Sequence, residues 1–288
     1  MAILGEGDFK YEPIAKWPEM PRYWSFDTAV GVAVNARDEI HVLSLGKHPV
    51  TIWNITGNFI SSWGEGSFSA NPHSLHIEPS GDVWVVDREY HIASQHTSGG
   101  EVVRVLGNKL SPSPTVFGEP FNQPSGLYTT SSGDIFVSDG YGSYRVHRFS
   151  SSGNLLRSWG DPGNGPGEFA LLHNVTTDKR DRVFICDRMN HRIQLFDHDG
   201  NYLEEWSGFN EPCEVWIRNE IAYVVEQGNG SAISIWTLDH EPITSWRGAC
   251  GPGKGTLTAG HSICVDSEGS IYVADVRGDA SIRKFQHI

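Results

Sequence analysis

Short runs in which apolar and polar residues alternate recur along the whole chain, and each is followed by a cluster of Gly, Asp, Ser or Asn. Residues 134–139 (DIFVSD), 145–149 (RVHRF) and 192–196 (RIQLF) are examples. Such alternation is typical of a β-strand with one buried face, and the polar clusters are typical of turns between strands. The pattern therefore predicts many short strands rather than long helices.

These runs belong to a unit that occurs six times. The copies cover residues 30–64, 72–107, 124–160, 172–207, 212–248 and 260–288, so successive copies start 40 to 52 residues apart. Each of the first five copies has three clear strand patterns and a fourth, which closes on Trp63, Trp159, Trp206 or Trp246 in four of them. A repeat of this length with four strands predicts a blade of a β-propeller.

The sixth copy stops at Ile288 after its third strand, and residues 10–17 (KYEPIAKW) precede the first copy. We expect this N-terminal segment to supply the missing strand, because a ring closed in this way leaves no exposed sheet edge. The prediction is an all-β, six-bladed β-propeller that forms one domain over residues 1–288. The Gly-rich stretch at residues 160–169 recurs in shorter form elsewhere and is interpreted as an inter-blade loop.

The composition of the chain excludes some classes of binding partner. The chain has 22 Lys and Arg against 35 Asp and Glu, a formal charge of −13, which argues against nucleic acids and anionic membranes as ligands. No run approaches the roughly 18 apolar residues of a membrane span, and the start of the chain lacks the pattern of a signal peptide. The four Cys show no CxxC spacing. We expect a cytoplasmic protein with a small-molecule substrate and no obligate protein partner.

The innermost strand of a propeller blade lines the central channel, so residues at one register face one another. The residues that open this strand are Val30, His73, Ser125, His173, Cys213 and His261. A single channel His is more often a hydrogen-bonded structural residue, but three on alternate blades suggest a metal site with an open position. Imidazole suits several metals, of which zinc is our expectation. Cys213 is either a further soft ligand or a small buried residue.

A second set of equivalent residues lies at the end of the second strand of each blade, and we call it the second ring. An acidic residue recurs there in five blades, and we interpret these carboxylates as hydrogen-bond acceptors for backbone amides of turns. The residues after them are more informative. Arg88 and Arg188 occupy one register, and Tyr141 is displaced from it by one residue. Arg matches a carboxylate, and Tyr near a dication can act as a base. These three residues are the candidates for substrate anchoring and proton transfer.

Four groups of segments carry a family resemblance: residues 72–87 (PHSLHIEPSGDVWVVD), 121–126 with 134–149 (FNQPSG, DIFVSDGYGSYRVHRF), 165–178 with 186–196 (GPGEFALLHNVTTD, CDRMNHRIQLF) and 260–276 (GHSICVDSEGSIYVADV). The units resemble NHL repeats. The whole chain is similar to the lyase module of peptidylglycine α-amidating enzymes and to its stand-alone microbial relatives.

The resemblance implies that His73, His173 and His261 match zinc ligands, that Tyr141 matches a catalytic tyrosine and that Arg188 matches one of two active-site arginines. The implied reaction cleaves the C–N bond of an α-hydroxylated glycine and releases an amide and glyoxylate. Zinc would polarise the hydroxyl, Tyr141 would take its proton, and an arginine would hold the carboxylate.

The chain departs from the family in three ways. Leu45 stands where the second arginine is expected, and Lys47 or Arg88 is a candidate replacement. Ser262 stands where the family has an Asp that binds calcium, which puts that ion in doubt. The copper monooxygenase of the bifunctional enzymes is absent from this sequence.

These departures shape the predicted function. The expected function is a zinc-dependent lyase acting on a small substrate, with Leu45, Lys47 and Cys213 as candidate substrate contacts. Because Leu45 is apolar, we expect that substrate to be less anionic or more hydrophobic than hydroxyglycine. The alternatives are a hydrolase on the same three-His site and a non-catalytic NHL scaffold. The calcium sites of lactonase-type propellers use oxygen ligands, which a ring of imidazoles does not supply.

Overall fold

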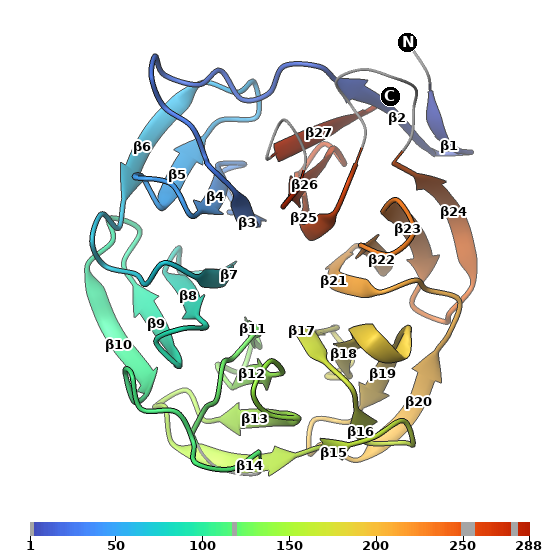
Figure 1. Cartoon of the computed structure of the whole chain (residues 1–288). Helices are drawn as coiled ribbons and strands as arrows, with labels where there is room; N and C mark the ends of the chain where they lie inside the picture. The colour runs from blue at the N-terminus through green and yellow to red at the C-terminus, as the bar shows by residue number, and fades with distance from the viewer. Residues whose placement is uncertain (1–2, 117–119, 249–256, 278–281) are drawn as a thin grey trace.

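A computed structural model describes residues 3–116, 120–248, 257–277 and 282–288. Six antiparallel sheets stand around a common axis like the blades of a propeller, as Figure 1 shows. In each blade the strand nearest the channel comes first in the sequence and the outermost comes last, with blade 6 as the exception. The predicted six-bladed, all-β fold is confirmed.

The strands of the first three blades are β3 (Ala29–Val34), β4 (Ile40–Ser44), β5 (Val50–Trp53) and β6 (Phe59–Trp63); β7 (Pro72–Ile77), β8 (Val83–Asp87), β9 (Ile92–His96) and β10 (Val102–Gly107); and β11 (Gly126–Thr129), β12 (Ile135–Asp139), β13 (Arg145–Phe149) and β14 (Leu155–Trp159). Blades 4 and 5 consist of β17 (Leu172–Thr177), β18 (Val183–Asp187), β19 (Arg192–Phe196) and β20 (Tyr202–Trp206), and of β21 (Pro212–Arg218), β22 (Ile221–Glu226), β23 (Ala232–Thr237) and β24 (Pro242–Arg247). The loop before β17 contains the short parallel pair β15 (Asp161–Pro162) and β16 (Glu168–Phe169), and one turn of 3-10 helix, η1 (Arg188–Asn190), follows β18.

Blade 6 joins the two ends of the chain. It contains β25 (Gly260–Val265), β26 (Ile271–Asp275), β27 (Ile282–His287), β2 (Phe9–Ile14) and β1 (Leu4–Glu6). The N-terminal β2 pairs with β27 from Tyr11 opposite His287 to Ile14 opposite Lys284, which confirms the predicted closure. The structure adds a fifth strand, β1, on the outside of β2, and the sequence pattern did not predict it.

The core lies between neighbouring blades, where large aromatic side chains are fully buried. The Trp residues that close the outer strands are part of it. Trp63 packs against Gly100 in a turn of the next blade, where φ is +91° and an added Cβ would lie 2.8 Å from the indole. Glycine is favoured at position 100 for two reasons: it adopts the left-handed backbone conformation without strain, and it leaves room for the Trp63 ring.

Five of the six inner strands begin with a β-bulge. The register shifts lie between Ala29 and Gly31, Pro72 and Ser74, Leu172 and Asn174, Pro212 and Glu214, and Gly260 and Ser262. The extra residues are Val30, His73, His173, Cys213 and His261, which belong to the first ring predicted from the repeats. A bulge redirects the side chain of its extra residue, so this irregularity lets a strand whose other side chains pack between blades present one side chain at the channel.

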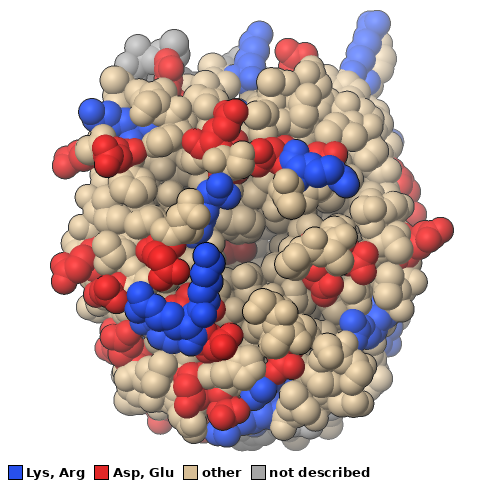
Figure 2. Space-filling view, turned by 180° about the vertical axis from the view of Figure 1, so that it is seen from behind, with Lys and Arg blue, Asp and Glu red and all other residues tan. Residues whose placement is uncertain are grey.

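Charged side chains on the face seen from behind Figure 1 are mixed rather than segregated, as Figure 2 shows. Ion pairs occur among the described residues: Arg180 lies 3.4 Å from both Glu220 and Asp239, and Arg182 lies 2.8 Å from Asp178. No helix within the described residues is long and apolar enough to cross a bilayer.

Candidate metal centre

His73, His173 and His261 meet at the channel. Their potential ligand atoms all lie within 4.8 Å of one another, and the ring centroids are 4.6 to 4.9 Å apart. All three side chains are buried, with exposed fractions of 2 to 8%. Among the described residues, no other group of three or more His, Cys, Asp or Glu is arranged to hold a metal ion. Three residues that are 88 to 100 positions apart in sequence thus form one cluster because their blades alternate around the ring.

Each imidazole is held by the blade that follows it. Nδ1 of His73, His173 and His261 lies 2.6, 2.8 and 2.7 Å from the backbone carbonyl oxygens of Ser125, Cys213 and Val30 respectively. These carbonyls belong to the other three members of the first ring. Because a carbonyl only accepts, each Nδ1 carries the proton and each Nε2 is the unprotonated nitrogen. The ring therefore alternates a ligand with the group that orients it.

The three imidazoles are neutral at pH 7. Burial lowers the pKa of His261 to about 4, and it lowers the pKa of His73 and His173 well below 6.5, reinforced by repulsion from His261. Nε2 of His173 is buried and has no hydrogen-bond partner among the described residues. A buried lone pair without a partner costs free energy unless something binds it.

This donor set fits a metal ion. Three imidazoles around a tetrahedral zinc have their ligand nitrogens about 3.4 Å apart, so a small rotation of the rings would bring the observed cluster onto an ion. The residues that would hold the metal are His73, His173 and His261.

Tyr141 lies directly beside this cluster. Its phenol oxygen is 3.0 Å from Nε2 of His73, and because that nitrogen is the unprotonated one, the phenol donates. Burial raises the pKa of Tyr141, while the neighbouring guanidinium groups of Arg188 and Arg88 act in the opposite direction. Tyr141 is therefore a protonated phenol whose pKa depends on two adjacent cations.

The structure corrects the alignment of Tyr141 within the second ring. Its backbone N–H donates to the carbonyl oxygen two residues before the first-ring residue of its own blade, Gln123. Four other residues make the equivalent bond, namely Leu45, Arg188, Gln227 and Val276. Tyr141 is therefore in the ring, not displaced by one residue, because Gly140 is inserted before it. Gly140 fits there because it has no side chain: a Cβ would lie 1.7 Å from the carbonyl oxygen of Leu172.

The second ring is polar on one side and apolar on the other. Blades 2 to 5 contribute Arg88, Tyr141, Arg188 and Gln227, whereas Val276 of blade 6 and Leu45 of blade 1 are the apolar members. Leu45 is 39% exposed. The second ring therefore contains charged, polar and apolar side chains.

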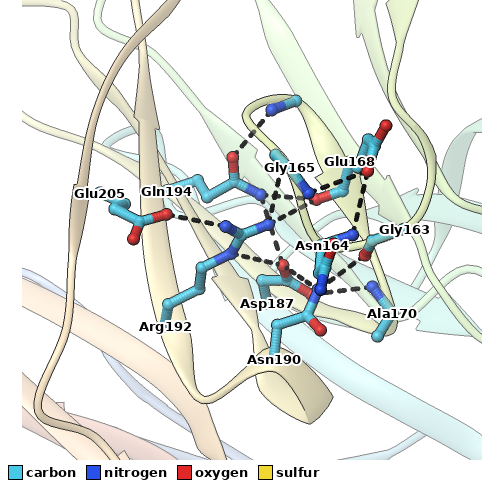
Figure 3. A network of polar contacts seen from close by, with 11 residues as sticks. Gly163, Asn164, Gly165, Glu168, Ala170, Asp187, Asn190, Arg192, Gln194 and Glu205 are labelled. Atoms are coloured by element: carbon cyan, nitrogen blue, oxygen red, sulfur yellow. Dashed lines mark hydrogen bonds and ion pairs between the residues drawn. The ribbon is translucent and has the colours of Figure 1, made fainter.

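A polar network around Asp187 and Arg192 ties the loop before β17 to the end of β18 and the turn after it, as Figure 3 shows. The buried carboxylate of Asp187 accepts hydrogen bonds from the backbone of Ala170, in the loop before β17, and from the side chains of Asn190 and Arg192. Arg192 also donates to the carbonyl oxygens of Gly165 and Glu168 in that loop. The loop leading to His173 and the turn carrying Arg188 are therefore held as one unit. This agrees with the interpretation of the recurring acidic residues as ligands of turn amides.

The remaining predicted contacts lie in different places. Lys47 lines a separate cavity with Tyr23, Trp24 and His48. The thiol of Cys213 is buried, its pKa is raised to about 12 by burial, and it is not part of the metal-ligand group, so its contribution to the cluster is its carbonyl. Cys250 lies outside the described residues.

The residues at the position of the doubtful calcium do not fit that ion. The Ser262 hydroxyl accepts from the backbone N–H of Val32 at 3.0 Å and donates to the carbonyl oxygen of Val32 at 3.3 Å. The nearby carboxyl group of Glu214 accepts from the N–H of Ile263 at 2.9 Å and from the amide of Asn174 at 3.2 Å. Calcium needs six to eight oxygen ligands, and here the hydroxyl is already satisfied by backbone.

Sequence reasoning missed two glutamines that hold the arginines. Arg88 donates from Nε to the side-chain oxygen of Gln123 at 3.1 Å, and Arg188 donates from one terminal nitrogen to that of Gln227 at 2.5 Å. The sequence does show that the two arginines stand in similar turns, because Asp-Arg-x-x-His occurs at both 87–91 and 187–191. It does not show which side chain each arginine contacts.

Comparisons with known proteins agree with the fold. A family model described as a 6-bladed beta-propeller (DUF5128) matches residues 121–215. NHL repeat-containing protein 3 of Homo sapiens is 29% identical over 93% of this chain and 82% of its own length. Peptidylglycine alpha-amidating monooxygenase of Rattus norvegicus is 29% identical over 67% of this chain but only 23% of that longer protein.

Two further similarities are informative. A probable peptidyl-alpha-hydroxyglycine alpha-amidating lyase of Caenorhabditis elegans is 33% identical over 48% of this chain and 39% of its own length. Among solved structures, a streptogramin B lyase superimposes with a TM-score of 0.64 over 96% of this chain and 87% of that one, at 15% identity, which supports the fold alone.

Proposed function

We propose, for a six-bladed β-propeller homologous to NHL repeat-containing protein 3 and to the peptidylglycine α-amidating enzymes, that this chain is a metal-dependent lyase for a small N-acylated α-hydroxy substrate. The observation that carries the proposal is the cluster of three buried, neutral imidazoles whose Nδ1 atoms are each fixed by a carbonyl and whose Nε2 atoms are unprotonated, with the Tyr141 oxygen 3.0 Å from Nε2 of His73 and Nε2 of His173 without a partner among the described residues. A purely structural ring would not need an unsatisfied nitrogen at its centre.

The chemistry requires a base near a polarised hydroxyl. A dication on His73, His173 and His261 would act as a Lewis acid on the substrate hydroxyl and would favour ionisation of that hydroxyl and of the adjacent phenol. Tyr141, as phenolate, takes the hydroxyl proton. The freed electron pair forms the carbonyl of glyoxylate or its derivative, the C–N bond breaks, and the amide nitrogen receives the bond pair. Tyr141 then returns the proton to that nitrogen, so atoms and charge balance.

Arg188 supports this role of Tyr141. Its positive charge and its hydrogen bond to the phenol both favour the ionised form. Gln227 and Glu211, the latter 3.6 Å away, hold the guanidinium on the side of Cys213. Arg188 is thus placed to stabilise the phenolate during proton transfer.

The decisive experiment measures metal and product together. Protein purified without a histidine tag is analysed for metal and incubated with α-hydroxy-N-acylglycines that carry small or apolar acyl groups. We expect about one zinc per chain, release of glyoxylate, and loss of both in His73→Ala. A matched control is His76→Ala, because His76 lies on the same strand but contacts Thr129, not the cluster.

The alternatives give different results. Metal-free, inactive wild-type protein would contradict the lyase proposal and favour a binding scaffold. Metal-loaded protein that cleaves esters or lactones but releases no glyoxylate would favour a hydrolase on the same three imidazoles.

A further inference from the structure

Blades 4 and 5 differ at one set of equivalent positions, although both carry an acidic residue at the end of the second strand. The pairs that strand pairing makes equivalent are Asp187 and Glu226, Arg192 and Ala232, Gln194 and Ser234, and Glu205 and Ser245. Blade 5 therefore keeps the acidic residue but replaces an arginine and two other long polar side chains by alanine and serine.

In blade 4 the arginine is the centre of the network in Figure 3. Its guanidinium donates to the carboxylates of Asp187 at 3.0 Å and Glu205 at 2.7 Å. It also donates to the carbonyl oxygens of Gly165 and Glu168, both at 2.9 Å, in the loop between β14 and β17. The planar fork of N–H groups is thus surrounded by acceptors, as this group requires when it is buried.

In blade 5 the equivalent space is a cavity of about 400 Å³. It lies on the side of the blade that packs against blade 4. Its lining includes Glu226, Ala232, Ser234, Trp236, Ser245 and Arg247. The short side chains leave part of this space open, and a short connection leaves the rest: only residues 207–211 join β20 to β21, whereas residues 160–171 join β14 to β17.

Glu226 is a buried carboxylate with unused acceptor positions. Its side chain is 5% exposed, and its two oxygens accept from the backbone N–H of Asn210 and the hydroxyl of Ser234, both at 2.7 Å. A carboxylate offers about four acceptor positions, so part of this capacity faces no donor among the described residues. Burial raises the pKa of Glu226, because removal from water without a cation nearby disfavours the charged form. A cation bound in the cavity would offset that cost.

The other walls suit a cation that carries an alkyl stem. The indole of Trp236 packs against the rings of Phe209 and His240, with centroids 5.0 and 5.3 Å away, so its position is fixed. An indole face attracts a guanidinium and packs against an alkyl chain. Arg247 is exposed and donates to the carbonyl oxygen of Asn229 at 3.4 Å, and among the described residues it forms no ion pair. It therefore leaves the carboxylate of Glu226 without a cationic partner.

We infer that the cavity between blades 4 and 5 binds an alkylguanidinium group, with Glu226 in the role that Asp187 has toward Arg192 and with Trp236 beside the alkyl stem. An arginine side chain of a peptide and a small guanidine share this chemistry. The inference does not rest on the proposed lyase function, because none of the residues that line the cavity belongs to the three-His cluster or to the second ring.

A titration followed by NMR spectroscopy tests the site. The probes are n-butylguanidinium and N-butylurea, which have the same shape but differ in charge. Binding is followed at the indole N–H signal of Trp236, assigned with Trp236→Phe. The variants are Glu226→Gln, which removes the charge but can keep the hydrogen bonds to Asn210 and Ser234, and Glu241→Gln as the matched control. Glu241 is an exposed carboxylate of the same blade that does not line the cavity.

Wild type should bind n-butylguanidinium saturably and N-butylurea about 10-fold or more weakly, because the urea lacks the charge. Loss of charge-assisted hydrogen bonds in Glu226→Gln should weaken binding of n-butylguanidinium by about 10-fold or more, whereas Glu241→Gln should bind as wild type. Arg247→Gln should strengthen binding by about two- to fivefold, since a like charge is removed from the wall. Unfolding temperatures exclude a folding defect.

Two further variants locate the ligand. Ala232→Arg supplies from the chain itself the guanidinium that blade 4 has, so it should abolish binding. His73→Ala, which disrupts the proposed metal centre, should bind as wild type, so this test and the test of the lyase function can fail separately. A third probe, Nα-acetylarginine N-methylamide, distinguishes the sources: an affinity within about threefold of that of n-butylguanidinium favours a peptide arginine, and a weaker one favours a small guanidine.

Three outcomes would overturn the site: no saturable shift of the Trp236 signal in wild type, equal affinities for n-butylguanidinium and N-butylurea, or unchanged affinity in Glu226→Gln. Binding by folded Ala232→Arg with the affinity of wild type would also overturn it, because the ligand would then occupy another place.

Discussion

Acidification should barely affect zinc binding to the three-His cluster, and this prediction tests the proposed centre most directly. An ordinary imidazole with a pKa of about 6.5 loses about eightfold of its unprotonated form between pH 7.0 and 5.5. Three such ligands together would weaken zinc by about 600-fold, or about 4 kcal/mol. With a pKa of about 4, His261 loses only about 3% of its neutral form over the same range, and His73 and His173 are shifted in the same direction.

Ligand protonation should therefore change the zinc affinity by less than about twofold between these two pH values. The assay is competition with a chelator whose own pH dependence is known, on tag-free protein that circular dichroism shows to be folded at each pH. A loss of 100-fold or more would refute the reasoning, because it would mean that the imidazoles titrate as if exposed and that the carbonyl-fixed, desolvated ring is absent.

Four further predictions concern individual residues. Tyr141→Phe should lower kcat by about 10²- to 10⁴-fold with zinc content unchanged; a change below about threefold in glyoxylate release would exclude Tyr141 as the base. Metal-free protein should lose stability as pH falls below 6.5 toward 4, because the unfolded state binds a proton at His41 while burial keeps the folded pKa of His41 at about 4. In urea titrations His41→Phe should reduce this slope by about 1.4 kcal/mol per pH unit, and an unchanged slope would show that His41 does not contribute. A calcium chelator should leave the unfolding temperature unchanged, whereas Ser262→Ala should destabilise the protein by about 1–3 kcal/mol by leaving the Val32 N–H unpaired; a chelator-induced drop would reveal a calcium site. Leu45→Arg should shift preference from ligands with a bulky apolar group toward smaller, more anionic ones, measured as a ratio of kcat/KM values, and a constant ratio would show that Leu45 does not contact the ligand.

The fold was predictable because it depends on local signals that repeat. Alternation with a period of two marks each strand, and turn residues mark its ends. Closure by β2 followed from counting strands in the last copy, whereas β1 escaped notice because Leu4–Glu6 is too short to show alternation.

The site was predictable only in part. Equivalent positions in the repeats identified His73, His173 and His261 because rotational symmetry turns sequence register into spatial proximity. The same reasoning treated Arg88 and Arg188 as equal, although among the described residues Arg188, unlike Arg88, forms an ion pair, with Glu211 at 3.6 Å. That difference arises from Glu211, which lies just before the first strand of the next blade. The repeat pattern within one blade does not reveal that contact.

The sequence by itself determined the number of blades, the closure of the ring and the identity of the side chains at the channel, since these follow from a repeated local pattern. Only the tertiary structure decided which nitrogen of each of the three His is unprotonated, which arginine pairs with a carboxylate and that Tyr141 belongs to the second ring. Those properties depend on contacts with neighbouring strands and blades: a carbonyl fixes each His, a carboxylate pairs with Arg188, and Gly140 leaves room for the carbonyl of Leu172. Because the contacting residues are far apart in sequence, a local pattern does not predict them.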